Sequence, residues 1–168
     1  MDRKPLARRA GQLKAASSMS ENPLNLYFRL FNEIGIIGQL SRSLLEAHLP
    51  PRFLLQHFAV LNHLVRVKDG QMPLHLARAF QVPKTSMTHT LAILAKAGLV
   101  ELRDNPDDGR SKCVWITEAG KAFRRNAIDN LAPDITRLVA KIPAGHIDTL
   151  LPLLTELRCI LDTDRDEV

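Results

Sequence analysis

The stretch PLHLARAFQVPKTSMTHTLAILAKAGLVELRDNPDDGRSKCVWITEAG, residues 73–120, decides the fold of this chain. Pro73 and Pro83 each fit the first position of a helix, and only Gln81 and Val82 separate the two short helices that they begin. A helix, a tight turn and a second short helix make up a helix-turn-helix. The first half of the stretch predicts that arrangement.

The second of these helices has an apolar side and a polar side. Met87, Leu91 and Leu94 recur at helical spacing and are expected to be buried. The polar side lies around the N-terminal turns, is expected to face outward, and consists of Lys84, Thr85, Ser86, Thr88 and His89. Small hydroxyls and cations at a helix N-terminus are groups that dock on DNA. The alternative, that at least one of them is only solvated helix surface, stays open.

The second half of the stretch predicts a β-hairpin. Gly98 is expected to cap the helix, and the segments LVELRD and KCVWIT, residues 99–104 and 112–117, alternate as strands do. The segment NPDDGR, residues 105–110, joins them and carries Arg110 at the tip. By itself this tip is an ordinary soluble turn, because Asp and Gly dominate turns. Behind a helix-turn-helix, the hairpin is expected to be the wing of a winged helix.

A long helix is predicted before this lobe. Asn22 is expected to cap it, Pro23 fits its first position, and Pro50 ends it. Its apolar stripe is broad, and Gly35 and Gly38 thin one face enough for another helix to approach closely. These features suit a helix that is buried against a partner chain.

Two more helices are predicted after the hairpin. Thr117 is expected to cap the first, and Pro133 to kink or interrupt its hydrogen-bond ladder. The last helix is expected from about Pro143 to Leu161, with a second bend at Pro152. The predicted fold class is therefore mainly α with a small β-hairpin wing (α+β), a winged helix-turn-helix lobe joined to a helical region.

The charge balance favours an anionic partner. The 168 residues include 23 Lys and Arg against 18 Asp and Glu, which gives a formal net charge of +5 and a pI near 9.6. Net charge is weak support by itself, since many basic proteins never bind nucleic acid.

The N-terminal segment, residues 1–22, is basic but lacks the apolar core of a signal peptide. Nowhere do about 18 apolar residues run together, as a membrane span requires. The chain is therefore expected to be neither exported nor embedded in a membrane. The segment is expected to be a flexible arm, and the alternative that it wraps around an anionic partner stays open.

Few residues point to catalysis or metal binding. Cys113 and Cys159 lie far apart without a Cys/His cluster, which argues against a disulfide framework or a zinc site and fits a reducing cytoplasm. No metal or other cofactor is expected, because ligand spacing is absent among the histidines, His48, His57, His63, His75, His89 and His146. An enzyme has the least support, since the sequence offers no Gly-rich phosphate loop, nucleophile elbow or working carboxylate pair.

Three segments resemble the MarR family of bacterial transcriptional regulators. They are FAVLNHL at 58–64, LARAFQVPKTSMTHTLAILAKAGLVE at 76–101, and DDGRSKCVWITEAGKA at 107–122. The last contains the family's wing pattern of Asp, any residue and Arg, followed by a strand that ends in Thr and Gly. The resemblance covers about Leu26 to Leu161.

The resemblance implies a homodimer on a pseudo-palindromic operator in double-stranded DNA. Residues 23–168 would form one domain, with dimerisation helices at about 23–49 and 118–162 and the winged helix-turn-helix at about 52–117. The first helix and the last two helices of each chain would intertwine, while each winged lobe reads half of the operator.

The resemblance also implies roles for the wing. Arg110 would enter the minor groove, where a narrow groove concentrates negative potential that a guanidinium matches well. Asp108 would hold the fork of that arginine in one orientation before DNA arrives. Gly109 would let the tip turn tightly.

In the recognition helix, Lys84, Thr85, Ser86 and Thr88 fall at positions that contact phosphates or base edges in the family. His89 stands where many members carry arginine, so the usual bidentate contact with guanine is in question. Gln81 occupies a turn position where glycine is common, and a left-handed conformation there costs roughly 1 to 2 kcal/mol without glycine.

Many relatives bind a small aromatic or phenolic effector between the dimer helices and the DNA-binding lobe. By position the lining would be Tyr27, Phe31, Phe53, His57 and Phe58. Aromatic residues at helical spacing are also ordinary core residues, and this alternative stays open.

The sequence thus predicts a cytoplasmic, homodimeric DNA-binding regulator, more often a repressor in this family. Control of its operator affinity by a small ligand is an open alternative. The alternative function is a winged helix that binds proteins and has no sequence-specific contact with DNA.

Overall fold

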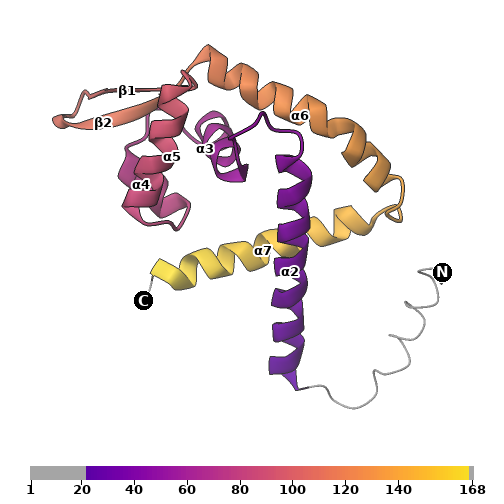
Figure 1. The fold of residues 1–168 in the computed structure, drawn as a ribbon. Helices are drawn as coiled ribbons and strands as arrows, with labels where there is room; N and C mark the ends of the chain where they lie inside the picture. Colours follow the sequence, from indigo (N-terminus) through magenta and orange to yellow (C-terminus); the bar gives the residue numbers. More distant parts are fainter. Residues whose placement is uncertain (1–21, 167–168) are drawn as a thin grey trace. The chain divides into compact units, whose positions relative to one another are not determined.

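The computed structural model describes residues 22–166, so nearly all of the predicted basic arm lies outside the described residues. The described chain contains six helices and one two-stranded hairpin (Figure 1). In chain order the elements are α2 (Pro23–Glu46), α3 (Leu55–Arg66), α4 (Pro73–Ala79), α5 (Lys84–Lys96), β1 (Val100–Asn105), β2 (Asp108–Ile116), α6 (Glu118–Val139) and α7 (His146–Asp166). The predicted fold class is confirmed. The described residues form two compact units, divided between Leu44 and Leu45.

The described part of the first unit is helix α2. It begins where the sequence predicts, because Asn22 Oδ1 accepts a hydrogen bond from the Leu24 backbone N–H at 3.0 Å. Many apolar side chains of α2 are solvent-exposed in the single chain, including Phe28 at 74% and Leu40 at 66% of their surface. A soluble helix rarely leaves so much apolar surface uncovered.

The core of the second unit lies in the lobe formed by α3, α4, α5 and the hairpin. Apolar positions spaced along α3 and α5 face inward, where α4, β1 and β2 pack against them. The best-buried side chains are Val60, Leu61, Leu64, Leu76, Leu94, Val100 and Val114. This core fixes the orientation of α5 and of the hairpin base.

The turn between α4 and α5 contains a residue other than glycine in the left-handed conformation, which is strained. Gln81 has a φ of 53°, in the left-handed region. The turn is closed by the Val82 backbone N–H, which donates to the Ala77 carbonyl at 3.0 Å. Proline starts α4 at its first position, as predicted, whereas Pro83 is the N-cap of α5 and the helix itself begins at Lys84.

Replacing Gln81 by glycine is expected to raise the free energy of unfolding by about 0.5 to 1 kcal/mol. Removing the Cβ relieves left-handed strain of about 1 to 2 kcal/mol, and the greater freedom of glycine in the unfolded chain offsets about half of it. Urea unfolding followed by circular dichroism measures the change. Gln81→Ala keeps a Cβ and is the control, expected to stay near the wild type. A lower midpoint for Gln81→Gly would refute strain at this turn.

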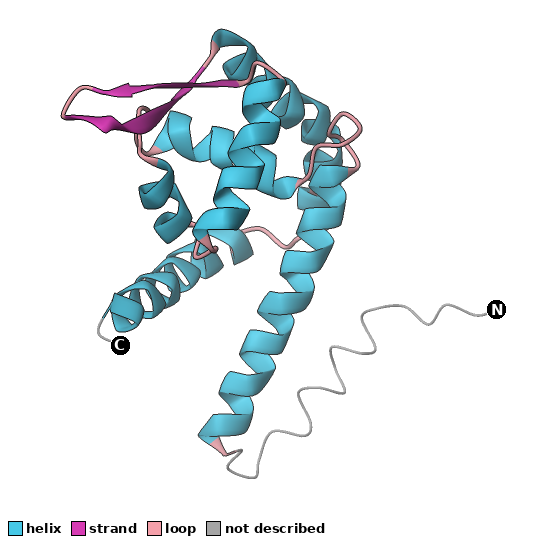
Figure 2. Ribbon diagram, turned by 60° about the vertical axis from the view of Figure 1, so that its left-hand side comes forward, coloured by secondary structure: helices cyan, strands magenta, loops and turns pink. Residues whose placement is uncertain are grey.

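The wing is longer than its sequence indicates. Strands β1 and β2 pair antiparallel from Val100↔Ile116 to Asn105↔Asp108, so only two residues lie between them. Figure 2 shows the hairpin, in magenta, extending beyond the helices of the lobe. The predicted six-residue tip is therefore wrong, and Arg110 lies within β2.

Side chains, not a glycine, hold the wing turn together. Asn105 Oδ1 accepts from the Asp107 backbone N–H at 3.1 Å, and its Nδ2 donates to Ser111 Oγ at 2.9 Å. Gly109 lies in β2 and is not among the residues with positive φ. The prediction that Gly109 makes the turn is wrong, because an Asx-type hydrogen bond does this instead.

The two C-terminal helices run through their prolines. Pro133 lies inside α6 and Pro152 inside α7, so the predicted interruption of α6 does not occur. A proline removes one backbone donor, and enough ordinary turns flank each one to keep the helix continuous. Helix α7 begins at His146, three residues later than predicted, and extends past Leu161. None of the helices between residues 22 and 166 is long and apolar enough to cross a membrane.

Candidate nucleic-acid interface

Helix α5 presents the polar face that its sequence predicts. Met87, Leu91 and Leu94 are buried, as expected, and Thr90 is buried with them. The five predicted contact residues, Lys84, Thr85, Ser86, Thr88 and His89, are all exposed. Their exposure confirms the predicted face, and their contacts with DNA stay a prediction.

Two exposed groups on this face differ in what they offer to a partner. Thr88 Oγ1 donates to the Lys84 carbonyl at 2.9 Å, so its hydroxyl presents lone pairs and its methyl group outward. The Lys84 ammonium has no ion-pair partner among the described residues. The N-terminal turn of α5 therefore carries an uncompensated cation beside the positive end of the helix dipole.

Acidic neighbours neutralise two of the three cations of the wing. Lys112 pairs with Asp104 across the hairpin. Arg103 donates to Glu101 at 2.9 and 3.1 Å, and its guanidinium also lies 5.6 Å from the centre of the Trp115 ring. These side chains are all at least half exposed or lie at the surface, so the pairs stabilise the wing little.

Arg110 is the exception among the wing cations. Its guanidinium has no hydrogen bond or ion pair with any residue between 22 and 166. Asp108 was expected to hold the arginine fork, and this is wrong for the free chain. Asp108 Oδ1 instead accepts from the Arg110 backbone N–H at 3.0 Å. The carboxylate therefore fixes the strand at Arg110 and leaves the guanidinium available to an anion.

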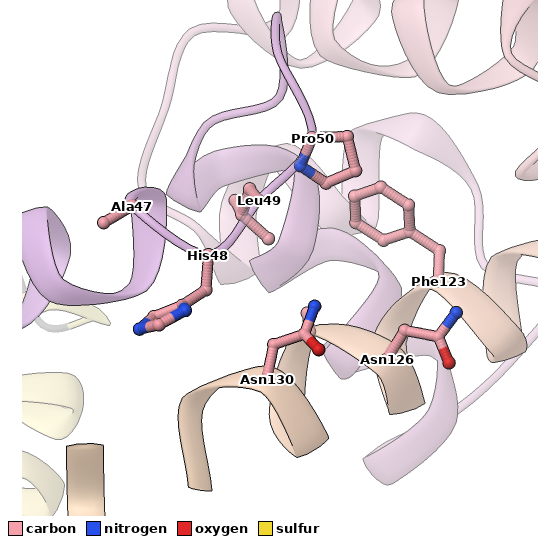
Figure 3. A pocket seen from close by; sticks show the side chains of 8 residues that line it. Ala47, His48, Leu49, Pro50, Phe123, Asn126 and Asn130 are labelled. Carbon is pink, nitrogen blue, oxygen red and sulfur yellow. The ribbon is translucent and has the colours of Figure 1, made fainter. Parts of the chain in front are cut away.

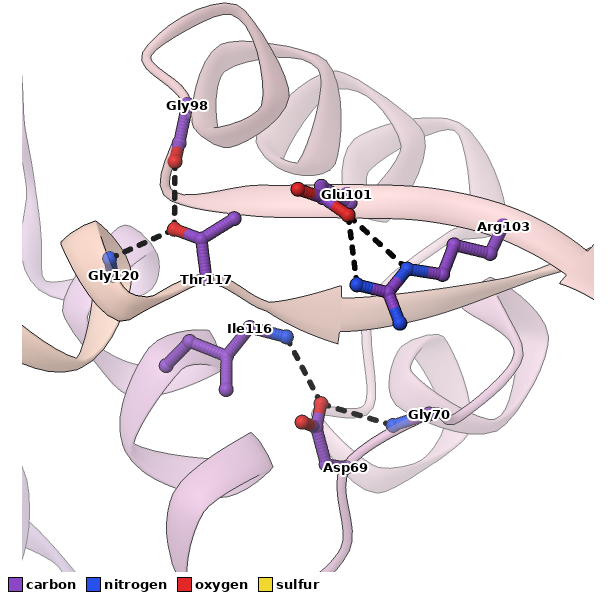
Figure 4. A network of polar contacts seen from close by, with 8 residues as sticks. All are labelled: Asp69, Gly70, Gly98, Glu101, Arg103, Ile116, Thr117 and Gly120. Atoms are coloured by element: carbon purple, nitrogen blue, oxygen red, sulfur yellow. Dashed lines mark hydrogen bonds and ion pairs between the residues drawn. The ribbon is translucent and has the colours of Figure 1, made fainter.

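Asp69 anchors the base of the wing (Figure 4). Its Oδ1 accepts from the backbone N–H of Gly70 and of Ile116, both at 3.0 Å. Val114 exchanges backbone hydrogen bonds with this loop, accepting from Gly70 at 3.0 Å and donating to Gln71 at 2.9 Å. The sequence shows Asp69 only as part of a turn, since its partner Ile116 lies 47 residues away.

Thr117 directly follows Ile116, the last residue of β2, and joins this same end of the strand to both neighbouring helices (Figure 4). Its Oγ1 donates to the Gly98 carbonyl at 2.7 Å and accepts from the Gly120 N–H at 3.0 Å. Its predicted role as N-cap of α6 is confirmed. The contact with Gly98, the left-handed residue after α5, was not foreseen.

His57 is a buried imidazole in the first turn of α3. It is 1% exposed, and its Nδ1 accepts from the Leu54 backbone N–H at 2.9 Å. The proton of the neutral ring therefore sits on Nε2, which has no hydrogen-bond partner among the described residues. Burial, foremost, and the positive charge of nearby His89 lower the pKa of His57 below its ordinary value. His57 has the role that Gln or Glu has in a capping box, because its ring accepts from the backbone N–H of the N-cap residue, Leu54.

The lowered pKa predicts how the stability of the lobe depends on pH. The unfolded chain binds a proton at His57 more readily than the folded chain, so stability is full above pH 6.5 and falls as the pH drops through the lower folded pKa. His57→Gln keeps an acceptor for Leu54 and cannot titrate, so its unfolding free energy should fall less between pH 7 and pH 5. Urea unfolding at each pH measures this, with exposed His146→Gln as control. If the unfolding free energies of the wild type and of His57→Gln fall equally with pH, His57 is excluded as the source of the pH dependence.

The five residues expected around an effector lie in different parts of the chain. Tyr27 and Phe31 lie on α2 in the first unit and are exposed. Phe53, His57 and Phe58 lie at the start of α3, where the Phe53 and His57 rings meet edge to face at 5.7 Å. Their role in effector binding stays a prediction.

A cavity of about 450 Å³ lies in the second unit between the loop after α2 and helix α6 (Figure 3). Its lining residues are Ala47, His48, Leu49, Pro50, Phe123, Asn126, Ala127 and Asn130. His48 Nε2 and Asp134 Oδ2 lie 2.7 Å apart, and this bond from His48 lowers the pKa of the carboxyl. The sequence does not reveal the pair, because 86 residues separate its members.

The remaining candidate groups are dispersed. Within residues 22–166, no cluster of three or more His, Cys, Asp or Glu side chains could hold a metal ion. Cys113 is buried in β2, and Cys159 is exposed on α7.

Comparison with known proteins agrees with this geometry. Residues 53–111 match the model of the MarR family. The apo form of MarR from E. coli is 26% identical with a TM-score of 0.66, and the match covers 76% of this chain and 96% of that one. A cysteine-to-serine variant of the same protein, complexed with operator DNA, is 25% identical with a TM-score of 0.67, covering 82% and 99%.

A third structure shares the fold at lower identity. The PcaV transcriptional regulator from Streptomyces coelicolor, in complex with its natural ligand, is 19% identical with a TM-score of 0.60, covering 94% of this chain and 97% of that one. The matched lobe, the wing and the fold are those of the MarR family of winged helix-turn-helix transcriptional regulators.

Proposed function

We propose that this chain represses transcription in the cytoplasm by binding a pseudo-palindromic operator as a homodimer, with Arg110 in the minor groove. The observation that carries the proposal is the unpaired guanidinium of Arg110, in a wing whose other two cations have acidic partners. The guanidinium has no anionic partner in the free chain, and a narrow minor groove supplies the negative potential that would attract it. The E. coli relative in complex with operator DNA supports operator DNA as the partner.

The exposed face of α5 would enter the adjacent major groove. The Lys84 ammonium would bind a phosphate, since it has no partner among the described residues. Thr85, Ser86, Thr88 and His89 would contact base edges or further phosphates. Thr88 offers lone pairs and a methyl group, which suit an exocyclic amino group or the methyl group of thymine.

The apolar surfaces of α2 and α7 support the homodimer. Side chains on both helices are exposed in the single chain, among them Leu40 at 66% and Leu151 at 61%. Burying such surface against a second copy would stabilise both helices by roughly 25 cal/mol for each Å². A two-fold dimer presents two recognition helices, which must sit about 34 Å apart to enter successive major grooves.

Ile37→Glu is expected to give monomers. The Ile37 side chain is 57% exposed in the single chain, so a carboxylate is tolerated there unless a partner covers it. Analytical ultracentrifugation measures the mass, and circular dichroism checks that the chain stays helical. Gln39→Glu adds the same charge to the same helix and is the control. A folded Ile37→Glu dimer would exclude this face from the interface.

We further propose that the cavity beside α6 takes a small aromatic or phenolic effector. Phe123, Pro50 and Leu49 supply apolar walls, and the amides of Asn126 and Asn130, one helical turn apart, supply polar groups (Figure 3). The PcaV structure, in complex with its natural ligand, supports ligand binding by a protein of this fold. An effector that hydrogen-bonds to His48 would compete with Asp134, which ties this loop to α6. Such a ligand would favour a spacing of the recognition helices that does not match the operator.

The alternative function, a winged helix that binds only proteins, predicts the opposite result in one experiment. Fluorescence anisotropy with DNA from upstream of the protein's own gene, and with scrambled DNA of equal composition, is measured over a series of salt concentrations. The proposal expects tighter, strongly salt-dependent binding to the native sequence. Equally weak binding to both, followed by failure to select any sequence from random DNA, would favour the protein-binding alternative.

A further inference from the structure

The hairpin changes register close to its tip. The residue before Asn105 pairs with Lys112 of β2, but Asn105 itself pairs with Asp108. Residues 109–111 of β2 therefore have no residue of β1 opposite them, and they form a β-bulge with Arg110 at its centre. Bulges of this kind often re-aim a side chain beside a binding site. The backbone at Arg110 thus depends on contacts other than pairing with β1.

Side chains hold the bulge in place of strand pairing. Asp108 Oδ1 accepts from the Arg110 backbone N–H at 3.0 Å, and Ser111 Oγ donates to the Asp108 carbonyl at 3.1 Å. The residues before and after Arg110 are therefore tied to each other and to its backbone. Neither bond uses the guanidinium, which stays available to a partner.

Asn105 connects the bulge to the helix-turn-helix. Its Nδ2 donates to Ser111 Oγ at 2.9 Å and also to Met72 Sδ at 3.7 Å. Met72 is the N-cap residue of α4. A continuous set of contacts therefore leads from the start of α4, through Asn105 and Ser111, to the backbone that carries Arg110.

The hydroxyl of Ser111 is poorly suited to bind DNA directly. Serine hydroxyls in protein–DNA interfaces commonly donate to phosphate oxygens. A hydroxyl has one hydrogen to donate, and that of Ser111 already goes to the Asp108 carbonyl. Asn105 and Ser111 are also half-buried, whereas Arg110 is exposed. Any effect of these two residues on DNA binding should therefore act through Arg110.

We infer that Asn105 and Ser111 are positioning residues for Arg110 in operator binding. They hold the bulge in one conformation relative to α4, so the guanidinium extends from a fixed point of the backbone. A group whose backbone is ordered before binding loses less freedom on entering a narrow groove than one on a mobile tip. The inference rests on the proposed function and adds to it two residues that act without touching DNA.

Ser111→Ala is the first test, by fluorescence anisotropy with the DNA that the wild type selects from a random pool. Kd should rise about three- to tenfold, because binding must then order the bulge. The slope of log Kd against log salt should stay at the wild-type value, since no cation is lost. Ser111→Thr restores the hydroxyl and should recover most of the affinity that alanine loses. Circular dichroism checks that each variant folds.

A double-mutant cycle with Arg110→Ala distinguishes positioning from direct contact. When Arg110 is already alanine, adding Ser111→Ala should change Kd by less than about twofold, because no guanidinium is left to place. Asn105→Ala should show the same pattern, with a higher Kd only when Arg110 is present. Amide hydrogen exchange in the free protein tests the cause without DNA, since the Arg110 N–H should exchange faster in Ser111→Ala than in the wild type.

The outcomes separate this inference from the proposed function. A Kd for Ser111→Ala equal to that of the wild type overturns the inference. An equal rise in Kd with and without the Arg110 side chain also overturns it, because the serine would then act on its own. In both cases specific binding by the wild type leaves the proposed function standing. If the wild type selects no sequence from the pool, both are wrong.

Discussion

Gly120→Ala is expected to lower the free energy of unfolding of the lobe by about 2 to 4 kcal/mol. A Cβ at this position would lie 2.1 Å from the Leu99 carbonyl oxygen and 2.8 Å from Ile116 Cγ1. Neither neighbour can move away easily, because Leu99 O accepts from Thr117 N–H and Ile116 N–H is held by Asp69. The first turn of α6 must therefore separate from the hairpin base or the turn must unwind.

Urea unfolding followed by far-ultraviolet circular dichroism measures this loss. Gly109→Ala is the matched control, because its Cβ meets nothing within 4 Å and its φ is not positive. That variant should stay within about 0.5 kcal/mol of the wild type. An unfolding midpoint for Gly120→Ala equal to that of Gly109→Ala would contradict the close packing at the junction of α6 and the wing.

Arg110→Ala is expected to weaken operator binding by about 1 to 3 kcal/mol, which is roughly a five- to 150-fold rise in Kd. The lost group is the wing cation that has no acidic partner, so little of its charge is neutralised before DNA arrives. The slope of log Kd against log salt should fall by about one, since one cation that neutralises the charge of the DNA phosphates from within the groove is lost. The dimer should stay intact, because Arg110 lies on β2 of the wing and not on α2 or α7, the helices to which the dimer interface is assigned.

The paired cation Arg103 provides the control for that measurement. Arg103→Ala removes a guanidinium that already binds Glu101, so its effect on Kd should be clearly smaller than that of Arg110→Ala. Arg110→Lys should recover part of the affinity, because an ammonium retains the charge but not the planar fork. If alanine at both positions raises Kd equally, the wing acts by net charge and Arg110 has no special place in the groove.

The sequence predicts well those features that depend on neighbours within a few residues. Helix caps at Asn22 and Thr117, the left-handed Gly98 and the exposed face of α5 all follow from local hydrogen bonding and helical spacing. The winged helix-turn-helix and its family follow for the same reason, since their motifs are local. Gln81 is also local, and its strain is present in the structure.

The errors lie where pairing or helix length outweighs a local preference. Five of the six residues in the run NPDDGR are typical of turns, but cross-strand pairing extends to Asn105↔Asp108 and shortens the turn. The Asp108 carboxylate accepts from the backbone N–H of Arg110, whereas the sequence pattern suggests a bond to the guanidinium of that arginine. Pro133 lies in a 22-residue helix, which continues despite one lost hydrogen bond.

Contacts between distant residues were not predictable from one sequence. Asp69 with Ile116 and His48 with Asp134 are ordinary polar residues until the fold brings them together. Gly120 is visible in the motif, yet the reason for a glycine there appears only from its approach to Leu99.

The hydroxyl of Thr117 has a mechanical consequence. One oxygen connects Gly98, just after α5, with Gly120 in the first turn of α6, and it does so from the residue that follows β2. A separate displacement of any one of these three parts would break a hydrogen bond of this hydroxyl. We therefore expect α5, the wing and the start of α6 to move together, and under the proposed function the contacts of α5 and of the wing with DNA would form or break in the same movement.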